Sequence, residues 1–311
     1  MSKANIEINM PMGNVSYDSN LGTYYQDFTE ALIHYNDNYF GEFDSNGIPM
    51  VGFGKDAHYS QIYIIQLGLI SHDLILKKVK QNENLQVLKR CVNWLIDNEE
   101  YFNESIIWRN NYSNERYGLS AGWVSSMYQG QIISLFLRYG QMTNQLDYFI
   151  EKSLKIYSYF DYHYNDGGVQ RRDENNNLWF EEYPSPEPSF VLNGFIYTLF
   201  GIVDLYRVTN DIRIQKVIDE CIETLENNMA KYSLNYWSIY DQLHKELASK
   251  YYHKNIHIPL MEIMFKLTKK KIFNDYKIKW EKQLNSPFNY ILVQIMYRLR
   301  PRILKLQKLI Q

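Results

Sequence analysis

The sequence predicts an all-α protein: an (α/α) toroid or incomplete barrel of about four helical hairpins, with a short β-hairpin and an extended N-terminal arm. Segments that are apolar all round alternate along the chain with segments that have one apolar and one charged face. Helices of the first kind are enclosed by the protein, and those of the second kind lie at its surface. Short connections join them in pairs, which is typical of an inner ring wrapped by an outer ring. A linear solenoid is the alternative, but no clear repeat supports it.

Three parts are expected along the chain. Residues 1–40 form an N-terminal arm and a first helix, because 1–21 are polar and rich in Gly, Asn and Ser, and aromatic residues follow from Tyr24 to Tyr39. Residues 41–285 form the helical barrel, and residues 286–311 form an amphipathic tail. The tail could dock on a partner subunit, so a homodimer is possible.

The first half of the barrel contains two helix pairs. Residues 59–77 have apolar side chains in helical register with little polar surface, and 85–98 are amphipathic. Residues 99–121 are expected to be a long polar and aromatic connection. Helices are expected at 122–142 and at 146–160, the second beginning near Thr143 and Asn144.

The second half begins with a β-hairpin over residues 166–180, whose turn is the run of three asparagines. Four further helices are expected, over residues 189–208, 212–229, 253–268 and 270–282. The first of them carries Asn193 and Asp204, so it is expected to be a buried helix rather than a membrane span.

A stiff loop precedes that buried helix. Between Trp179 and Gly194 the sequence holds two adjacent acids, a tyrosine and three prolines. Prolines fix φ and remove backbone donors, so residues 184–188 belong to neither a helix interior nor a central strand. Such a loop can hold polar groups at the mouth of a cavity, although a plain connection is equally consistent with its composition.

Composition excludes several classes of protein. The net charge of −2 gives no electrostatic reason to expect nucleic acid as a partner, and no stable membrane insertion is expected. Cys91 and Cys221 are too few for a disulfide scaffold or a thiolate metal cluster. His253 and His257 have metal-ligand spacing but lack an accompanying carboxylate, so no metal is expected. The first residues lack an apolar signal core, which favours a cytoplasmic location.

Tyrosine is unusually abundant, with 28 residues, and six tryptophans accompany it. Aromatic rings with a polar tip suit carbohydrate clefts, because they stack on sugar faces and hydrogen-bond hydroxyl groups. A general enrichment that also raises Asn, Lys and Ile explains many of these tyrosines equally well.

The chain contains these motifs in order: Gly47–Met50, Tyr59–Gly68, Gly122–Gln131, Trp179–Pro184, Ser189–Tyr197, Ile239–Asp241, and Tyr252-His253 with His257-Ile258. Together they resemble one family, the C-terminal catalytic region of D-glucuronyl C5-epimerases. Those enzymes convert D-glucuronate to L-iduronate within heparosan-type polysaccharides. The resemblance covers roughly residues 40–265 and leaves no room for the large β-rich domain of the animal members.

The resemblance implies a site without a redox cofactor, because epimerisation removes a proton beside a carboxylate and returns one on the opposite face. It implies that Tyr183 and Tyr252 are the opposed acid/base pair, that Tyr240 orients the sugar, and that Glu182 assists Tyr183. The partner implied is a uronate-containing polysaccharide. The residues expected to bind it are Asn193, Tyr59, Gln129, Gln131, His244, His253, Arg171 and Trp179.

One position departs from the family pattern. An arginine that contacts the substrate carboxylate is expected where this chain has Leu243. The developing enediolate needs a cation or equivalent donors nearby. The residues considered as substitutes are His244, Arg171, Arg172, Arg109 and Lys254.

Three functions are consistent with the sequence. The first is a uronyl C5-epimerase acting on a heparosan-like or capsule-type glycan. The second is a polysaccharide lyase, which shares the C5 proton abstraction and then expels the C4 oxygen. The third is a non-catalytic glycan-binding or assembly protein, which Leu243 favours.

Overall fold

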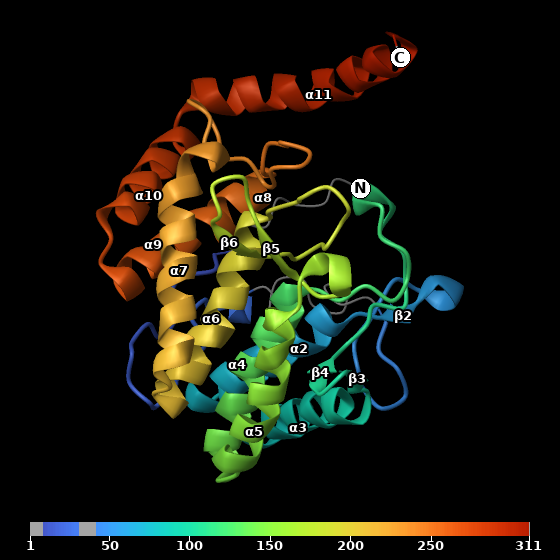
Figure 1. Ribbon diagram of the computed structural model, residues 1–311, viewed down its shortest axis with the longest axis vertical. Coiled ribbons are helices and arrows are strands. Elements are labelled where there is room, and N and C mark those ends of the chain that lie inside the picture. Colours follow the sequence, from blue (N-terminus) through green and yellow to red (C-terminus); the bar gives the residue numbers. More distant parts are fainter. Residues whose placement is uncertain (1–8, 31–41, 311) are drawn as a thin grey trace.

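The computed structural model describes residues 9–30 and 42–310, with side chains as far as residue 299. The described chain is mostly helical and contains short two-stranded sheets, which confirms the predicted all-α class. The paired helices form the body, and α11 (Pro287–Ile310) projects across one end of it (Figure 1).

Eight of the described helices form four consecutive pairs. Nearly every residue of α4 and α6 is buried, whereas α3, α5 and α7 bury one face each, so the inner and outer helices lie where the hydrophobic pattern predicts. The pairs are α2 (Gln61–Leu76) with α3 (Gln81–Asp97), α4 (Ser126–Thr143) with α5 (Leu146–Tyr157), α6 (Leu192–Thr209) with α7 (Ile212–Asn228), and α9 (Ile258–Thr268) with α10 (Lys271–Leu284).

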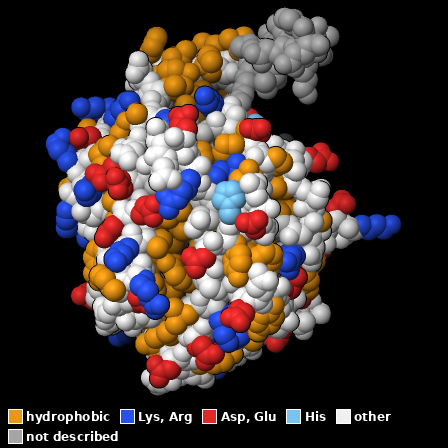
Figure 2. Space-filling view, viewed as in Figure 1, with side chains coloured by type: hydrophobic (Ala, Val, Ile, Leu, Met, Phe, Trp, Pro, Cys, Tyr) orange, Lys and Arg blue, Asp and Glu red, His pale blue; other side chains and the backbone are white. Residues whose placement is uncertain are grey.

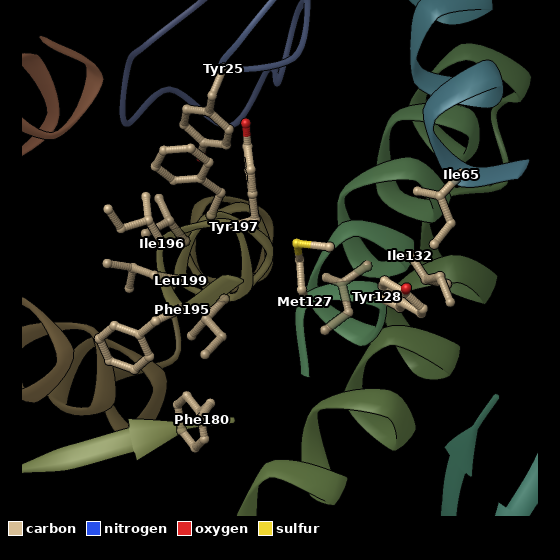
Figure 3. Packing of buried hydrophobic residues seen from close by; sticks show 14 of the residues in the cluster. Tyr25, Ile65, Met127, Tyr128, Ile132, Phe180, Phe195, Ile196, Tyr197 and Leu199 are labelled. Atoms are coloured by element: carbon tan, nitrogen blue, oxygen red, sulfur yellow. The ribbon is translucent and has the colours of Figure 1, made fainter. Parts of the chain in front are cut away.

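The inner helices α4 and α6 approach each other closely. A Cβ atom on Gly201 would lie 2.0 Å from the carbonyl oxygen of Gly130, so any side chain there would force the helices apart. Figure 3 shows apolar side chains on both sides of this contact, including Met127 and Ile132 on α4 and Ile196 and Tyr197 on α6. The contact fixes the relative position of the residues at the start of each helix.

The N-terminal segment closes the gap between the first and last pairs. The backbone N–H of Tyr24 donates to Asp73 of α2 at 3.1 Å, and the amide of Gln26 donates to the carbonyl of Asn255 at 2.6 Å. The helices alone therefore make an incomplete ring, and the arm completes it. Residues 29 and 30 are helical, and most of the first helix expected between Tyr24 and Tyr39 lies outside the described residues.

A buried charge cluster, the Asp204 cluster, anchors this arm. Asp204 accepts hydrogen bonds from Ser134 at 2.6 Å, Tyr25 at 2.8 Å, Arg207 at 3.1 Å, and from Arg138. Arg207 also donates to the carbonyl of residue 18 at 2.8 Å and to that of residue 20 at 2.9 Å. Asp204 is therefore a fully hydrogen-bonded structural acid.

The predicted β-hairpin is present as β5 (Gln170–Arg172) paired with β6 (Leu178–Phe180). Two more hairpins were not predicted: β1 (Met50–Val51) with β2 (His58–Tyr59), and β3 (Glu100–Phe102) with β4 (Ser105–Ile107). The second lies in the segment expected to be a connection. Asn103 has a φ of 52° at its turn, a conformation that Asn adopts more readily than most residues.

The helix expected from His253 has a more complex start. A short α8 (Lys250–Tyr252) passes through a π-helical turn (His253–His257) into α9. Single π turns are often found near functional sites. No helix in the described part of the chain is both long and apolar enough to cross a membrane.

Candidate functional site

The proline-containing loop before α6 is held by a buried acid. Glu181 accepts hydrogen bonds from the backbone N–H groups of Ser189 at 3.1 Å and Phe190 at 3.0 Å, and α6 begins after them at Leu192. Arg171 lies 3.3 Å from Glu181 and donates to the carbonyl of Ser185 at 2.5 Å. The loop is thus a rigid support for the side chains that follow Glu181.

Glu182 is buried beside the first turn of α6. A Cβ atom on Gly194 would lie 2.2 Å from Glu182 Oε2, so glycine at this position makes room for the carboxyl group. Burial raises the pKa of Glu182 to about 8, and the charge of Asp241 adds to the rise, while hydrogen bonding from Tyr183 opposes it. Glu182 Oε2 has no hydrogen-bond partner among the described residues. This carboxyl group is therefore largely protonated at neutral pH and has spare hydrogen-bonding capacity.

Two cavities meet at Tyr183 and Tyr252. The first, the Asn193 cavity, has a volume of about 430 Å³, and the second, the Arg116 cavity, about 380 Å³. The two tyrosines line both cavities and therefore lie at the boundary between them. Besides these tyrosines, the Asn193 cavity is lined by Met10, Phe28, Ile62, Tyr63, Gln66, Met127, Tyr128, Glu182, Asn193, Tyr197, Tyr251 and Ile256, and the Arg116 cavity by Asn114, Arg116, Tyr117, Tyr240, Glu246, Leu247, Ser249 and Tyr297.

Tyr240 stands next to Tyr252, with their rings edge to face and the centroids 5.1 Å apart. Burial raises the pKa of Tyr183 and of Tyr240 well above the ordinary value, and the charge of Glu182 raises them further. Burial also raises the pKa of Tyr252 to about 12, and Glu182 contributes to that rise. All three phenols therefore carry their protons at neutral pH, and Glu182 ionises more readily than any of them.

Arg116 and Tyr117 complete the second cavity. The Tyr117 ring stacks on Tyr183 with the centroids 4.1 Å apart and an interplanar angle of 13°. Its hydroxyl donates to buried Asp241 at 2.8 Å. Arg116 lies over the Tyr117 ring and pairs with Glu246 at 2.9 Å and with Asp241 at 3.5 Å. A guanidinium group thus lines the same cavity as the three site tyrosines.

Arg116 and Tyr117 are site residues that were not expected from the sequence. Both lie in the segment between residues 99 and 121 that was expected to be a connection. The signal available was an Arg-Tyr pair shortly before the Gly122–Gln131 motif. They belong to the site because the Tyr117 ring stacks on Tyr183 and Arg116 lies over that ring. Tyr183 is far along the chain, so a local sequence pattern does not predict this contact.

Five of the expected site residues line the two cavities: Tyr183, Tyr252, Tyr240, Glu182 and Asn193. The Oδ1 atom of Asn193 is buried and has no hydrogen-bond partner in the described structure. His244 lies beside them, because its backbone N–H donates to Asp241 at 2.6 Å and its ring lies against Tyr117 with the centroids 5.0 Å apart.

The other six expected residues lie outside both linings. Tyr59 donates to Asp44 at 2.9 Å and packs on Trp94, outside both linings. Arg171 and Trp179 line a third cavity, which the proline-containing loop also borders. Trp179 is also a core residue, 1% exposed.

The side chains of His253, Gln129 and Gln131 are packed inside the protein. His253 stacks on Trp237 with the centroids 3.8 Å apart and shares the hydroxyl of Ser238 with His257. Gln131 lies within 3.4 Å of the Tyr24 hydroxyl, and both amide atoms of buried Gln129 lack a hydrogen-bond partner among the described residues. No group of three or more His, Cys, Asp or Glu side chains placed to hold a metal occurs in the described residues.

The substitutes considered for the arginine expected at Leu243 have other partners. Arg109 pairs with Glu100 at 2.8 Å, and Arg172 pairs with Glu220 at 2.5 Å. Leu243 itself packs against the hydrophobic core. Among the described residues that line the two cavities, Arg116 is the one arginine.

Comparison with known proteins gives one family. The model of the family described as "D-glucuronyl C5-epimerase C-terminus" matches residues 100–282. A curated "D-glucuronyl C5-epimerase" of Caenorhabditis elegans is 25% identical over 243 residues, which is 72% of this chain and 39% of that protein. An uncharacterized protein of Methanocaldococcus jannaschii is 30% identical over 179 residues, which is 56% of this chain and 57% of that protein.

This chain therefore spans less than two thirds of each of these relatives. Among solved structures, the crystal structure of PssZ from Listeria monocytogenes aligns over 94% of this chain and 97% of that one. The TM-score is 0.36 and the sequence identity is 11%.

Proposed function

This chain belongs to the family described as D-glucuronyl C5-epimerase C-terminus, and on that premise we propose that it inverts C5 of D-glucuronate residues within a polysaccharide, giving L-iduronate. The observation that supports this most is the placement of Tyr183 and Tyr252 in the linings of two adjoining cavities, with Glu182 beside them. An acid/base reaction at one carbon needs a proton-transferring group on each face, and two tyrosines shared by two cavities suit that need.

The group that we propose starts proton transfer is the ionised form of Glu182, which is the minor form at neutral pH and makes up about half of the molecules near pH 8. As Tyr183 takes the proton from C5, its own phenolic proton passes to the Glu182 carboxylate. The electron pair left on C5 is delocalised into the uronate carboxyl group as an enediolate. Tyr252 then donates its proton to the opposite face of C5. Hydrogen bonding of Tyr240 with both Tyr183 and Tyr252 offers a route by which the proton on Glu182 returns to Tyr252.

Arg116 is the cation that we propose stabilises the substrate carboxylate. It lines the cavity of the three tyrosines, and an enediolate carries more negative charge on its oxygens than the ground state does. Its present partner Glu246 is partly exposed, so an entering carboxylate can compete for the guanidinium group. In this chain a residue before α4 would thus do what an arginine at the Leu243 position does elsewhere in the family.

The substrate that we propose is a heparosan-like or capsule-type polymer. Two cavities that meet at the reactive tyrosines leave space for sugar residues on both sides of the one that reacts. Asn193, Tyr197 and Tyr128 offer amide and phenol groups that can hydrogen-bond sugar hydroxyls in the first cavity.

The proposed reaction is tested by incubating the protein with heparosan in deuterium oxide. Deuterium at C5 and iduronate in the product are expected. An ultraviolet absorbance from unsaturated uronate, with chain cleavage, would show a lyase instead. Absence of both label and cleavage on every uronate polymer tried would favour a non-catalytic glycan-binding protein.

Arg116 is tested by Arg116→Gln, with Arg109→Gln as the matched control on a surface ion pair. A fall in kcat of about 10²-fold is expected for the first, the usual size of effect when one charge-stabilising donor is removed. The control should keep its rate. Partial recovery of kcat in a double variant of Arg116→Gln and Leu243→Arg would show that the two positions serve one group of the substrate. Unchanged kcat in Arg116→Gln would remove Arg116 from the mechanism.

A further inference from the structure

A third cavity, the Lys231 cavity, has a volume of about 590 Å³ and shares no lining residue with the other two. It lies between the β5–β6 hairpin, the turn before that hairpin, the proline-containing loop, the end of α7 and the loop after Tyr240. Its lining comprises His163, Tyr164, Asn165, Arg171, Arg172, Asp173, Glu174, Trp179, Pro188, Phe190, Asn228, Lys231, Gln242 and Lys245.

Several of its charged groups already have structural partners. Arg171 pairs with Glu181 and donates hydrogen bonds to carbonyls of the proline-containing loop. Its guanidinium group lies 3.4 Å from the centre of the Tyr164 ring. Arg172 pairs with Glu220. Asp173 accepts from the backbone and side chain of Asn177, and these hydrogen bonds lower the pKa of the Asp173 carboxyl group although burial opposes them.

Lys231 and Lys245 are different, because neither forms an ion pair within the described residues. They come from two separate segments, and the amide of Gln242 joins these segments by donating to the carbonyl of Lys231 at 2.9 Å. The lining holds two acids, Asp173 and Glu174, and neither forms an ion pair within the described residues. Asp173 is held by its hydrogen bonds from Asn177, and Glu174 is exposed. The cavity therefore offers two exposed cations that form no ion pair, beside one hydrogen-bonded carboxylate and one solvated acid.

Neutral groups in the same lining suit a molecule rich in hydroxyls. Asn165, Asn228 and Gln242 have side-chain amides, and Tyr164 has a phenol. Amides and phenols both donate and accept hydrogen bonds, which is the requirement for recognising sugar hydroxyls. Outside the cavity, acidic and basic side chains are interspersed over the face shown in Figure 2, so general surface charge would not select an anion there.

Two loops connect this cavity to the proposed reaction site. In the proline-containing loop, Tyr183 lines the first two cavities and Phe190 lines the third. In the loop over residues 233–249, Tyr240 lines the second cavity and Lys245 lines the third. Phe190 and Lys245 have φ values of 41° and 50°, a region that L residues rarely adopt. Tyr232 holds the strained residue Phe190 by donating to its carbonyl at 2.6 Å. Both strained positions thus lie in loops that serve both sites.

From these observations we infer that the Lys231 cavity is a second carbohydrate subsite, which binds an acidic sugar residue through Lys231 and Lys245. That this residue belongs to the same polymer chain as the reacting uronate rests on the proposed function. The subsite would hold a uronate some distance along the chain while another lies at Tyr183 and Tyr252. Its effect would be on polymer affinity and not on the chemical step.

The test is the double variant Lys231→Glu and Lys245→Glu, with Lys216→Glu and Lys266→Glu as a control of equal charge change at exposed positions outside the three cavities. Exposed charge pairs contribute modestly, so reversing two is expected to raise KM for polymeric heparosan by about tenfold. The kcat value and the KM for the shortest oligosaccharide that reacts should be unchanged. Glu174→Gln should lower the polymer KM.

Equal polymer KM in the double variant and the control would overturn the subsite. Wild-type protein that exchanges no C5 proton would instead overturn the proposed reaction. In that case calorimetric binding of heparosan decides: weaker binding by the double variant alone supports the subsite, and equal binding by both variants excludes it. Wild-type protein that neither binds nor labels heparosan would overturn both proposals.

Discussion

Two buried polar regions lie at opposite ends of the same pair of inner helices, and they differ in whether their polar side-chain atoms have hydrogen-bond partners. At the C-terminal ends of α4 and α6, Asp204 has four hydrogen-bond donors from Ser134, Tyr25, Arg138 and Arg207. At the N-terminal ends, Gln129, Asn193 and Glu182 are equally buried, yet each has side-chain atoms without a partner in the described structure.

This difference distinguishes polar groups that stabilise the fold from polar groups that can bind a ligand or take part in a reaction. A buried polar group without a partner costs about 1–3 kcal/mol, so a fold retains one where a ligand supplies the missing hydrogen bonds or where the group takes part in chemistry. The Asp204 cluster closes the ring by anchoring the N-terminal arm. The N-terminal ends of the same helices leave polar atoms available beside the Asn193 cavity.

Removal of Asp204 should have the largest effect on stability. Asp204→Ala leaves the buried guanidinium groups of Arg138 and Arg207 without their carboxylate, so a loss of about 3–5 kcal/mol in the free energy of unfolding is expected. Chemical denaturation measures it. Asp219→Ala, an exposed position on α7, is the control and should change stability by less than about 0.5 kcal/mol. Equal losses would show that the Asp204 cluster does not hold the fold.

Glu182 should lower the stability of the fold as pH rises, whereas an acid in an ion pair raises stability as it ionises. Its pKa is raised to about 8 in the folded state, so between pH 4.5 and 8 the folded protein holds a proton that the unfolded chain has released. Stability from this group is complete below that range and declines as pH rises through it.

The variant Glu182→Gln keeps the shape and removes this proton linkage. It should therefore gain roughly 2–4 kcal/mol at pH 8 relative to wild type, and much less at pH 4.5. Denaturation at the two pH values measures the difference. A smaller decline should remain in the variant, because burial also raises the pKa of Glu181 to about 7. Parallel pH profiles for variant and wild type would contradict the assignment.

Gln129 should have the smallest effect and the opposite sign to Asp204. Gln129→Met keeps the volume and removes two unpaired polar atoms, so stability should rise by about 1 kcal/mol. Thermal unfolding measures it, with Gln131→Met as the control, because Gln131 has the Tyr24 hydroxyl as a neighbour. Loss of stability in Gln129→Met would show that water hydrogen-bonds the Gln129 amide and that this amide stabilises the fold, as the Asp204 cluster does.

The sequence predicted the helix pairs because hydrophobic periodicity reports burial on each helix. The prolines that follow Tyr183 predicted a stiff loop around Glu182 and Tyr183, because proline excludes regular structure there. Arg116 was not predicted, since its position depends on stacking of Tyr117 against a residue far along the chain. Arg171 was expected in the substrate site, but side chains alternate along β5, and the structure points Arg171 toward Glu181 and the Lys231 cavity.

The central claim is that Tyr183 and Tyr252 act on opposite faces of C5. It is tested most directly by deuterium exchange with Tyr183→Phe and Tyr252→Phe, using one polymer that contains only glucuronate and one enriched in iduronate. The account predicts mirror-image results: each variant loses exchange from the epimer whose C5 proton faces the missing phenol and inverts neither. Undiminished exchange from both epimers in either variant would contradict it.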